Sequence, residues 1–254
     1  MELTIHANAA DVQKRLDEIA RDQLPFASSL ALNRVMYAVK DGLVDEMKKV
    51  FDRPTPYTLN SLFTKASTKR NLIAYVGIKD ESMKAQAPSR WLAPQVHGGD
   101  RGLKRFEDRM RAAGILGPGQ YVVPGPAAKL DAYGNMSRGQ IVAILSDVQA
   151  HWDPTQNSTG ESRAKRARRK RRGGIYFAIR WHRGKLRPGV YERIGFGFGS
   201  AVRPVMIFTD KAPSYRKRLD MERVGKEIMG RRYEDEFRIA LDQAISTAIV
   251  KQAS

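Results

Sequence analysis

The sequence contains no cysteine among its 254 residues. This absence excludes a disulfide framework, a thiolate zinc site, an iron–sulfur cluster and a cysteine nucleophile. Long apolar runs are also missing, and none approaches the ~20 residues that a membrane-spanning helix needs. The N-terminus, Met1–Asn8, lacks a basic start followed by an apolar stretch, so it predicts no secretory signal. We therefore expect a soluble protein without a membrane partner, made in the cytoplasm.

Acidic residues are scarce, because 27 Asp plus Glu stand against 45 Lys plus Arg, a formal charge of +18. A charge this large predicts a polyanionic partner, with nucleic acid ahead of an acidic protein surface. The densest basic run places eight basic residues within ten positions and contains no acid: Arg163, Lys165, Arg166, Arg168, Arg169, Lys170, Arg171 and Arg172.

Turn-forming residues flank this run on both sides, so residues 153–174 are predicted to form one flexible, disordered-looking basic loop. We expect the eight basic side chains to bind nucleic acid or an acidic partner. Binding should be independent of base sequence, because no recognition helix, zinc finger or aromatic RNA-binding motif accompanies the run. The plainer alternative is a loop that only keeps the protein soluble.

Helical periodicity predicts two long amphipathic helices, one over Phe26–Phe51 after a break at Pro25 and one from about Leu219 to Val250. A short helix from Pro56 to about Phe63 follows the first, with Thr55 as its cap. The predicted fold class is α+β, with a small antiparallel β-sheet flanked by the two long helices. The strand-like runs that would supply this sheet are 72–78, 174–181, 189–194 and 203–209.

Four segments are expected along the chain. Residues 1–80 would supply the N-terminal helices and first strand of a core domain, which residues 175–254 complete. Residues 81–152, rich in Gly and Pro, read as an insertion with helices at about 101–113 and 137–150. Residues 153–174 are the basic loop.

No catalytic constellation emerges from the residue types and spacings. Gly195–Ser200 lacks the third glycine and the βαβ setting of a dinucleotide loop. The four histidines are far apart, and the adjacent carboxylates Glu234–Glu236 fan around a helix, where ion pairs with nearby arginines are the simpler interpretation. The sequence predicts no enzyme activity, no metal and no cofactor.

Several segments taken in order suggest a family. Ser29-Leu30-Ala31-Leu32-Asn33-Arg34-Val35 opens a long helix, a basic loop precedes an antiparallel region, and Arg203–Ile207 leads to a long C-terminal helix. This order resembles the minor tail protein Z family of lambda-like tailed bacteriophages. Longer prophage relatives also look similar at Val50–Leu59 and Leu130–Gln140, so for them the resemblance spans nearly the whole chain. For the shorter lambda-type protein it spans about 25–80 and 160–250, and segment 81–152 is the departure.

The resemblance implies a tail-completion protein of the virion neck, at the head–tail junction. Such neck proteins have a small sheet flanked by helices, form rings and carry no enzyme activity or cofactor. The implied partners are further copies of the chain, the tail terminator, the head-joining proteins, the tail tube or tape measure, and the viral DNA end. The implied location is the tail or neck of the virion, assembled in the host cytoplasm.

Two other readings stay open. One is a non-specific nucleic-acid-binding protein without a virion role, for which salt-sensitive DNA binding without assembly is diagnostic. The other is an unrecognised DNA-processing enzyme, which would require metal-dependent cleavage.

Overall fold

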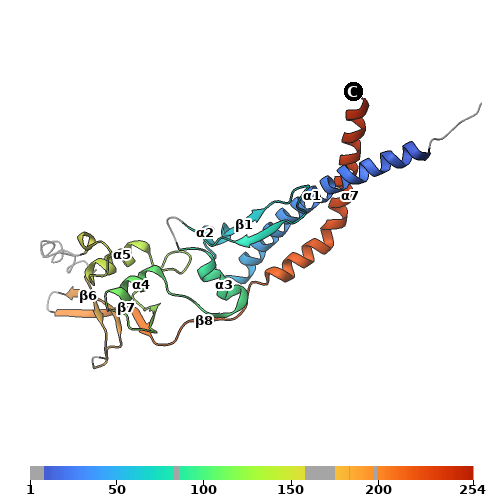
Figure 1. The fold of residues 1–254 in the computed structure, drawn as a ribbon. Coiled ribbons are helices and arrows are strands. Elements are labelled where there is room, and N and C mark those ends of the chain that lie inside the picture. Colours follow the sequence, from blue (N-terminus) through green and yellow to red (C-terminus); the bar gives the residue numbers. More distant parts are fainter. Residues whose placement is uncertain (1–8, 83–85, 158–174, 183, 197–198, 254) are drawn as a thin grey trace, which may run out of the picture. The chain divides into compact units, whose positions relative to one another are not determined.

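The computed structural model of the chain describes residues 9–82, 86–157, 175–182, 184–196 and 199–253 (Figure 1). The eight predicted binding residues between Arg163 and Arg172 lie outside these ranges. The chain divides into two compact units. We call the first, with residues 1–79 and 218–254, the helical unit, and the second, with residues 80–217, the sheet unit.

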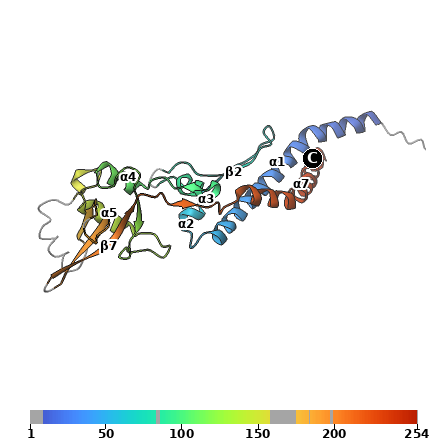
Figure 2. The same cartoon turned by 90° about the horizontal axis from the view of Figure 1, so that it is seen from below.

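Two long helices form most of the helical unit, α1 (Ala9–Val50) and α7 (Met221–Ala253). They run antiparallel and lie side by side in both views (Figures 1 and 2). The predicted break at Pro25 is wrong, because α1 continues through this proline. A proline inside a helix removes one backbone hydrogen bond. The burial of α1 against α7 directly after Pro25 offsets that loss.

The contact after Pro25 is a seam of small side chains. Ala27 and Ala31 of α1 pack with Ala240 and Ala244 of α7, and all four are buried. Short side chains allow two helix axes to approach closely, which favours dispersion contacts between the helices. Further along the pair, a Cβ added at Gly42 would meet the end of the Ile228 side chain. The two helices are therefore in close contact at this second site as well.

A β-hairpin completes the helical unit. Helix α2 (Pro56–Leu59) begins at the predicted Thr55 cap, whose hydroxyl accepts from the Thr58 N–H at 3.1 Å. It ends before Phe63, contrary to the prediction, because the chain continues into strand β1 (Leu62–Lys65). β1 pairs antiparallel with β2 (Tyr75–Ile78) and buries Leu62. Backbone pairing of β1 with β2 thus replaces the expected last turn of helix.

The sheet unit is built on a four-stranded antiparallel sheet in the order β4-β7-β6-β5. Helices α4 and α5 pack in its core with the strands (Figure 2). The bounds are β4 (Tyr121–Pro124), β5 (Ile175–Ile179), β6 (Gly189–Phe196), β7 (Gly199–Thr209), α4 (Arg105–Ala112) and α5 (Arg138–Asp147). The unit also holds α3 (Ser89–His97), a one-turn 3₁₀ helix (Pro154–Gln156), and β3 (Gly99–Asp100), which pairs with β8 (Ser214–Tyr215).

The core of the sheet unit is apolar and closely packed. Ile144 and Leu145 of α5 and Met110 of α4 are buried with Val190 and Met206 of the central strands. Strands β6 and β7 approach so closely at Gly189 that an added Cβ would meet the Met206 carbonyl oxygen. Only glycine fits this position without moving backbone.

The α+β class, the two long helices and the antiparallel character of the sheets are confirmed. The expected single sheet from 72–78 and 174–209 is wrong, since β2 pairs with β1 in a separate sheet. Strands β5–β7 instead share a sheet with β4, so residues 175–209 build one core with part of the segment expected to be an insertion. No helix among the described residues is long and apolar enough to cross a membrane.

A candidate assembly surface on the helical unit

Asn33 of α1 holds the β1–β2 hairpin through the backbone of Ser67. Its side-chain Nδ2 donates to the Ser67 carbonyl oxygen at 3.2 Å, and its Oδ1 accepts from the Ser67 N–H at 2.7 Å. The Ser67 hydroxyl donates to the Ser29 carbonyl oxygen at 3.0 Å and lies 3.1 Å from the Ser29 hydroxyl. Ser29 and Asn33 are four residues apart, one turn of the same helix face. Together they clamp the chain just after β1.

The next residue of the same segment binds α7. Arg34 places one guanidinium nitrogen 3.5 Å from the Glu236 carboxylate, and another donates to Gln243 Oε1 at 2.9 Å. Ala31, between Ser29 and Asn33, lies in the alanine seam. Residues 29–34 therefore connect α1 to both the hairpin and α7.

The clamped hairpin presents open strand edges. Within the described residues its sheet has two strands, so each strand pairs on one side. The Lys79 N–H donates to the Ser61 carbonyl oxygen at 2.9 Å, and bonded pairs alternate along an antiparallel ladder. The backbone N–H and C=O of Leu62 and Thr64 consequently point away from β2, and because Leu62 is buried, the edge is accessible at Thr64. Unpaired edge groups of this kind are a template for a strand from another chain.

The outer face of the hairpin is apolar and basic. Phe63 covers Gly77 across the strands and remains 42% exposed, and Tyr75 remains 49% exposed. Leu72 and Ile73, just before β2, are also exposed. Residues 54–79 contain Lys65, Lys69, Arg70 and Lys79 and no acid. This exposed apolar set is of a kind that marks protein interaction surfaces.

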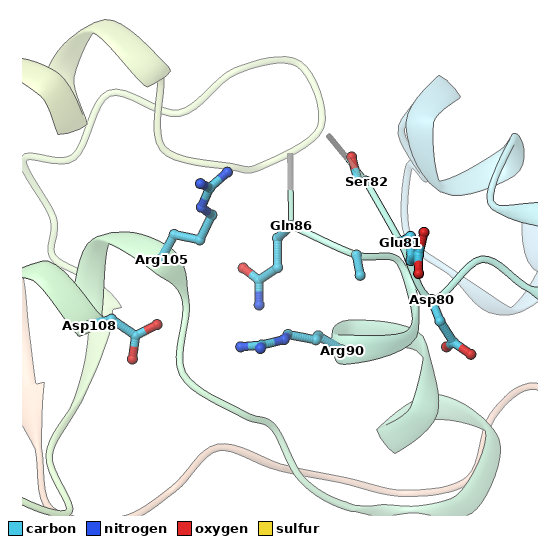
Figure 3. Close-up of a pocket in the computed structure, with 8 residues that line it drawn as sticks. Asp80, Glu81, Ser82, Gln86, Arg90, Arg105 and Asp108 are labelled. Atoms are coloured by element: carbon cyan, nitrogen blue, oxygen red, sulfur yellow. The ribbon is translucent and has the colours of Figure 1, made fainter. Parts of the chain in front are cut away.

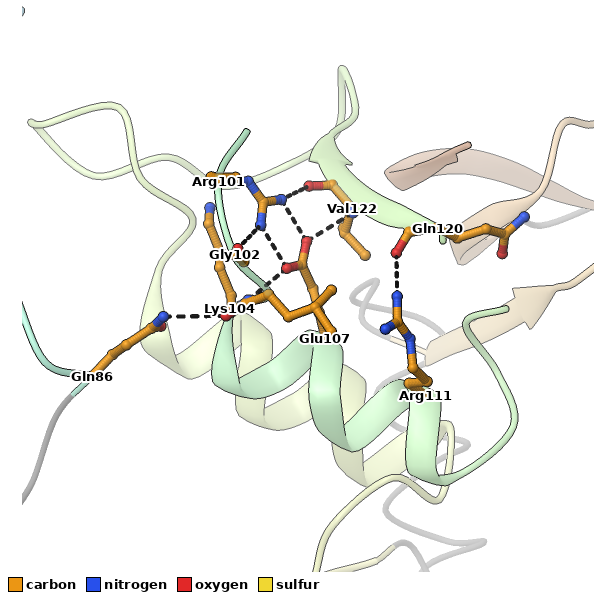
Figure 4. A network of polar contacts seen from close by, with 9 residues as sticks. Gln86, Arg101, Gly102, Lys104, Glu107, Arg111, Gln120 and Val122 are labelled. Atoms are coloured by element: carbon orange, nitrogen blue, oxygen red, sulfur yellow. Dashed lines mark hydrogen bonds and ion pairs between the residues drawn. The ribbon is translucent and has the colours of Figure 1, made fainter. Parts of the chain in front are cut away.

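In the sheet unit, by contrast, an ion pair covers the outer edge of β4 (Figure 4). Glu107 accepts the Val122 N–H at 2.8 Å, and Arg101 donates to the Val122 carbonyl oxygen at 3.2 Å. The two side chains pair with each other at 2.6 and 2.7 Å. Glu107 also accepts the Lys104 N–H at 2.7 Å, at the start of α4. The pair thus occupies the hydrogen-bonding position of a neighbouring strand.

The surroundings of Glu107 also determine its ionisation. Burial alone raises the pKa of the carboxyl, but hydrogen bonds from Arg101 and from the Lys104 and Val122 N–H groups outweigh it. The pKa of Glu107 is therefore lowered, and the buried side chain is a carboxylate at neutral pH.

A second carboxylate covers the opposite edge of the sheet. Asp147, at the end of α5, is buried and accepts the Tyr176 N–H of β5 at 3.0 Å. Each edge strand of this sheet thus bonds to a buried acidic side chain. Such capping discourages pairing with other chains, so the hairpin of the helical unit is the better candidate for strand addition.

Charge is distributed unequally between the two units. The helical unit holds 19 Lys plus Arg against 16 Asp plus Glu, a net charge of +3, by counting over its residues. The sheet unit holds 26 against 11, a net charge of +15. Attraction to polyanions is therefore concentrated in the sheet unit. The charge of this unit includes the run 163–172.

An open cavity in the sheet unit is lined by Asp80, Glu81, Ser82, Gln86, Ala87, Arg90, Arg105 and Asp108. Figure 3 shows Gln86 and Arg90 reaching toward its middle while the Asp80 carboxylate points away. Among the described residues no group of three or more His, Asp or Glu side chains could hold a metal ion. Of the acids at 234–236, Asp235 pairs with Arg238, as the sequence suggested, whereas Glu236 pairs with Arg34 of α1, 202 positions away.

Comparisons with protein families, with curated proteins and with solved structures gave no match.

Proposed function

We propose that the chain is a structural component of a tailed-phage virion, a tail-completion protein at the head–tail junction that assembles as a ring. The observation that carries this proposal is the hairpin with open edges and an exposed apolar face, clamped by Ser29 and Asn33. A subunit of a ring must present surfaces that other subunits complete, and a rigidly held open strand suits that task.

The resemblance to the tail protein family supports the proposal at the same residues. Ser29, Ala31, Asn33 and Arg34 each have a defined contact in the helical unit. The near-neutral charge of that unit suits subunit packing, since like-charged faces repel. The strongly basic sheet unit supports contact with DNA or with acidic tail proteins, in which the run 163–172 would take part.

The test is quantitative mass spectrometry of gradient-purified particles from the phage or induced prophage that encodes the chain. We expect a small fixed copy number relative to the tail-tube subunit, about six or a simple multiple of six. Absence from the particles would overturn the proposal. In that case the alternative, a nucleic-acid-binding protein without a virion role, becomes the leading account.

The same particles can test the hairpin. We expect the double variant F63E/Y75E to be lost from particles, because charge on the outer face would have to be desolvated at an interface. The matched control is Met229→Glu, another exposed apolar residue of the helical unit. Incorporation of F63E/Y75E at the wild-type copy number would exclude the hairpin face from assembly.

A further inference from the structure

The loop that joins β5 to β6, residues 180–188, carries an exposed tryptophan among basic residues. We call it the tryptophan loop. Trp181 is 81% exposed, the highest value among the large apolar side chains of the described residues. The loop sequence also contains Arg180, His182, Arg183, Lys185 and Arg187, of which Arg183 lies outside the described residues. Tryptophan side chains are highly buried on average, and here an exposed indole stands among basic residues, which makes the loop a candidate binding site.

The position of Trp181 differs from the sequence prediction. In the sequence, Tyr176, Phe177 and Trp181 could stack on bases, but their alternation over 174–181 favours a strand that packs them on the core. Tyr176 is indeed buried, and the half-buried Phe177 stacks on Tyr191 with ring centroids 6.0 Å apart. β5 ends at Ile179, however, so Trp181 lies beyond the sheet and outside the core.

The base of the loop is fixed to the sheet. Ile179 and Gly189 pair across β5 and β6, which closes the loop at its two ends. The Tyr191 hydroxyl donates to the Arg187 carbonyl oxygen at 2.9 Å, and the Phe208 N–H donates to the Pro188 carbonyl oxygen at 3.0 Å. The exposed ring is therefore presented from an anchored loop, which lowers the entropic cost of binding.

The charged residues of the loop sequence are all basic. No Asp or Glu lies between Glu161 and Glu192 in the sequence. Arg180, Lys185 and Arg187 are exposed in the structure, and Arg193 on β6 lies over the Phe177 ring at 5.2 Å. The charged residues that precede and follow Trp181 in this stretch of sequence would thus all attract phosphate.

We propose that the tryptophan loop binds single-stranded nucleic acid, with the indole of Trp181 stacked on an unpaired base. Arg180, Lys185 and Arg187 would contact the flanking phosphates. Aromatic rings in a basic setting bind single strands in this way without reading base sequence. A single strand fits better than a duplex, because paired bases keep their faces within the stack. An acidic protein would form ion pairs with the basic side chains but would gain less from contact with the exposed indole ring.

The test measures binding of a fluorescent 20-nucleotide oligo(dT) and of a duplex of equal length to the full-length protein by anisotropy. We expect Trp181→Ala to weaken oligo(dT) binding about 5- to 100-fold and to leave duplex binding unchanged. Trp181→Phe should restore part of the affinity, because phenylalanine also stacks. The control is Trp152→Ala, since Trp152 of the same unit is 66% exposed and lies outside the loop.

The run 163–172 could dominate both affinities, so each variant is also made with those eight residues replaced by glutamine. In that background the Trp181→Ala effect on oligo(dT) should persist. Unchanged oligo(dT) affinity in both backgrounds would overturn the proposal. It would also be overturned if polyglutamate bound with the same dependence on Trp181, because the ligand would then be an acidic protein.

Discussion

The side-chain amide of Asn33 satisfies both backbone groups of Ser67, donating to its carbonyl oxygen and accepting from its N–H. One residue of α1 thereby replaces two hydrogen bonds that a neighbouring strand would provide. The Ser67 hydroxyl, bound at Ser29, adds a third contact on the same helix face. The hairpin is thus fixed to α1 by polar groups, and its outer face remains available to other molecules.

Replacing Asn33 with leucine should release the hairpin. The change leaves the backbone groups of Ser67 without their partner, at a cost of about 1–3 kcal/mol. Hydrogen exchange measured by mass spectrometry should be faster in residues 61–79, and α7 should be affected much less. The control is Asn71→Ala, since Asn71 is an exposed residue of the hairpin turn. Unaltered exchange in 61–79 would show that the clamp is dispensable.

Breaking the Arg101–Glu107 pair from one side should destabilise the sheet unit strongly. Glu107→Gln leaves the Arg101 guanidinium buried without a counter-charge, which costs about 3–5 kcal/mol. The double variant R101M/E107L removes both charges and should regain much of that loss. Urea unfolding followed by circular dichroism measures the differences. Arg238→Gln, which breaks an exposed pair with Asp235, should cost less than about 1 kcal/mol.

The same pair predicts a pH dependence. The pKa of Glu107 in the folded chain lies below its ordinary value of 4.5. A lowered folded pKa contributes stability that is present above about pH 4.5 and is lost as pH falls through the folded pKa. Thermal unfolding between pH 6 and pH 3 should show this loss for the sheet unit. R101M/E107L should show a shallower fall; an identical pH profile would assign the acid sensitivity to other groups.

Asp147→Ala should open the β5 edge of the sheet. The variant leaves the Tyr176 N–H without its acceptor, and we expect faster exchange at this amide and a greater tendency to aggregate. Asp147→Asn keeps an oxygen acceptor and should retain most of the protection. NMR exchange rates at Tyr176 and light scattering measure the two effects. Equal protection in the alanine variant would mean that the edge is closed by other groups.

The sequence predicted those parts of the fold that depend on local pattern. The long helices follow from apolar spacing, and the predicted Thr55 cap accepts a hydrogen bond from the N–H group three residues later. The pairing partners of short strands depend on distant residues and could not be read this way. β1 has four residues and follows a helix cap, so its pattern favoured a longer helix.

The contacts that hold the candidate surface could not be predicted from the sequence, for the same reason. Asn33 and Ser67 are separated by 34 positions, and no local pattern links an asparagine on a helix to a loop backbone. Asp147 and Tyr176 are likewise separated by 29 positions, so the hydrogen bond between them follows from the position of β5 and not from a local pattern. The charge of the chain was evident from composition, whereas its concentration in the sheet unit required the division of the chain at residues 79 and 217.

The alanine seam between α1 and α7 has a consequence for axial register. Alanine has no side-chain rotamers to lose, so the contact forms without that entropic cost. Methyl groups present almost the same surface at each turn, however, and sliding by one turn would preserve much of the packing. Two polar pairs outside the seam, Arg34 with Gln243 and Glu46 with Arg223, define one alignment. The alanines thus determine the distance between α1 and α7, whereas the polar pairs determine the position of one helix along the other.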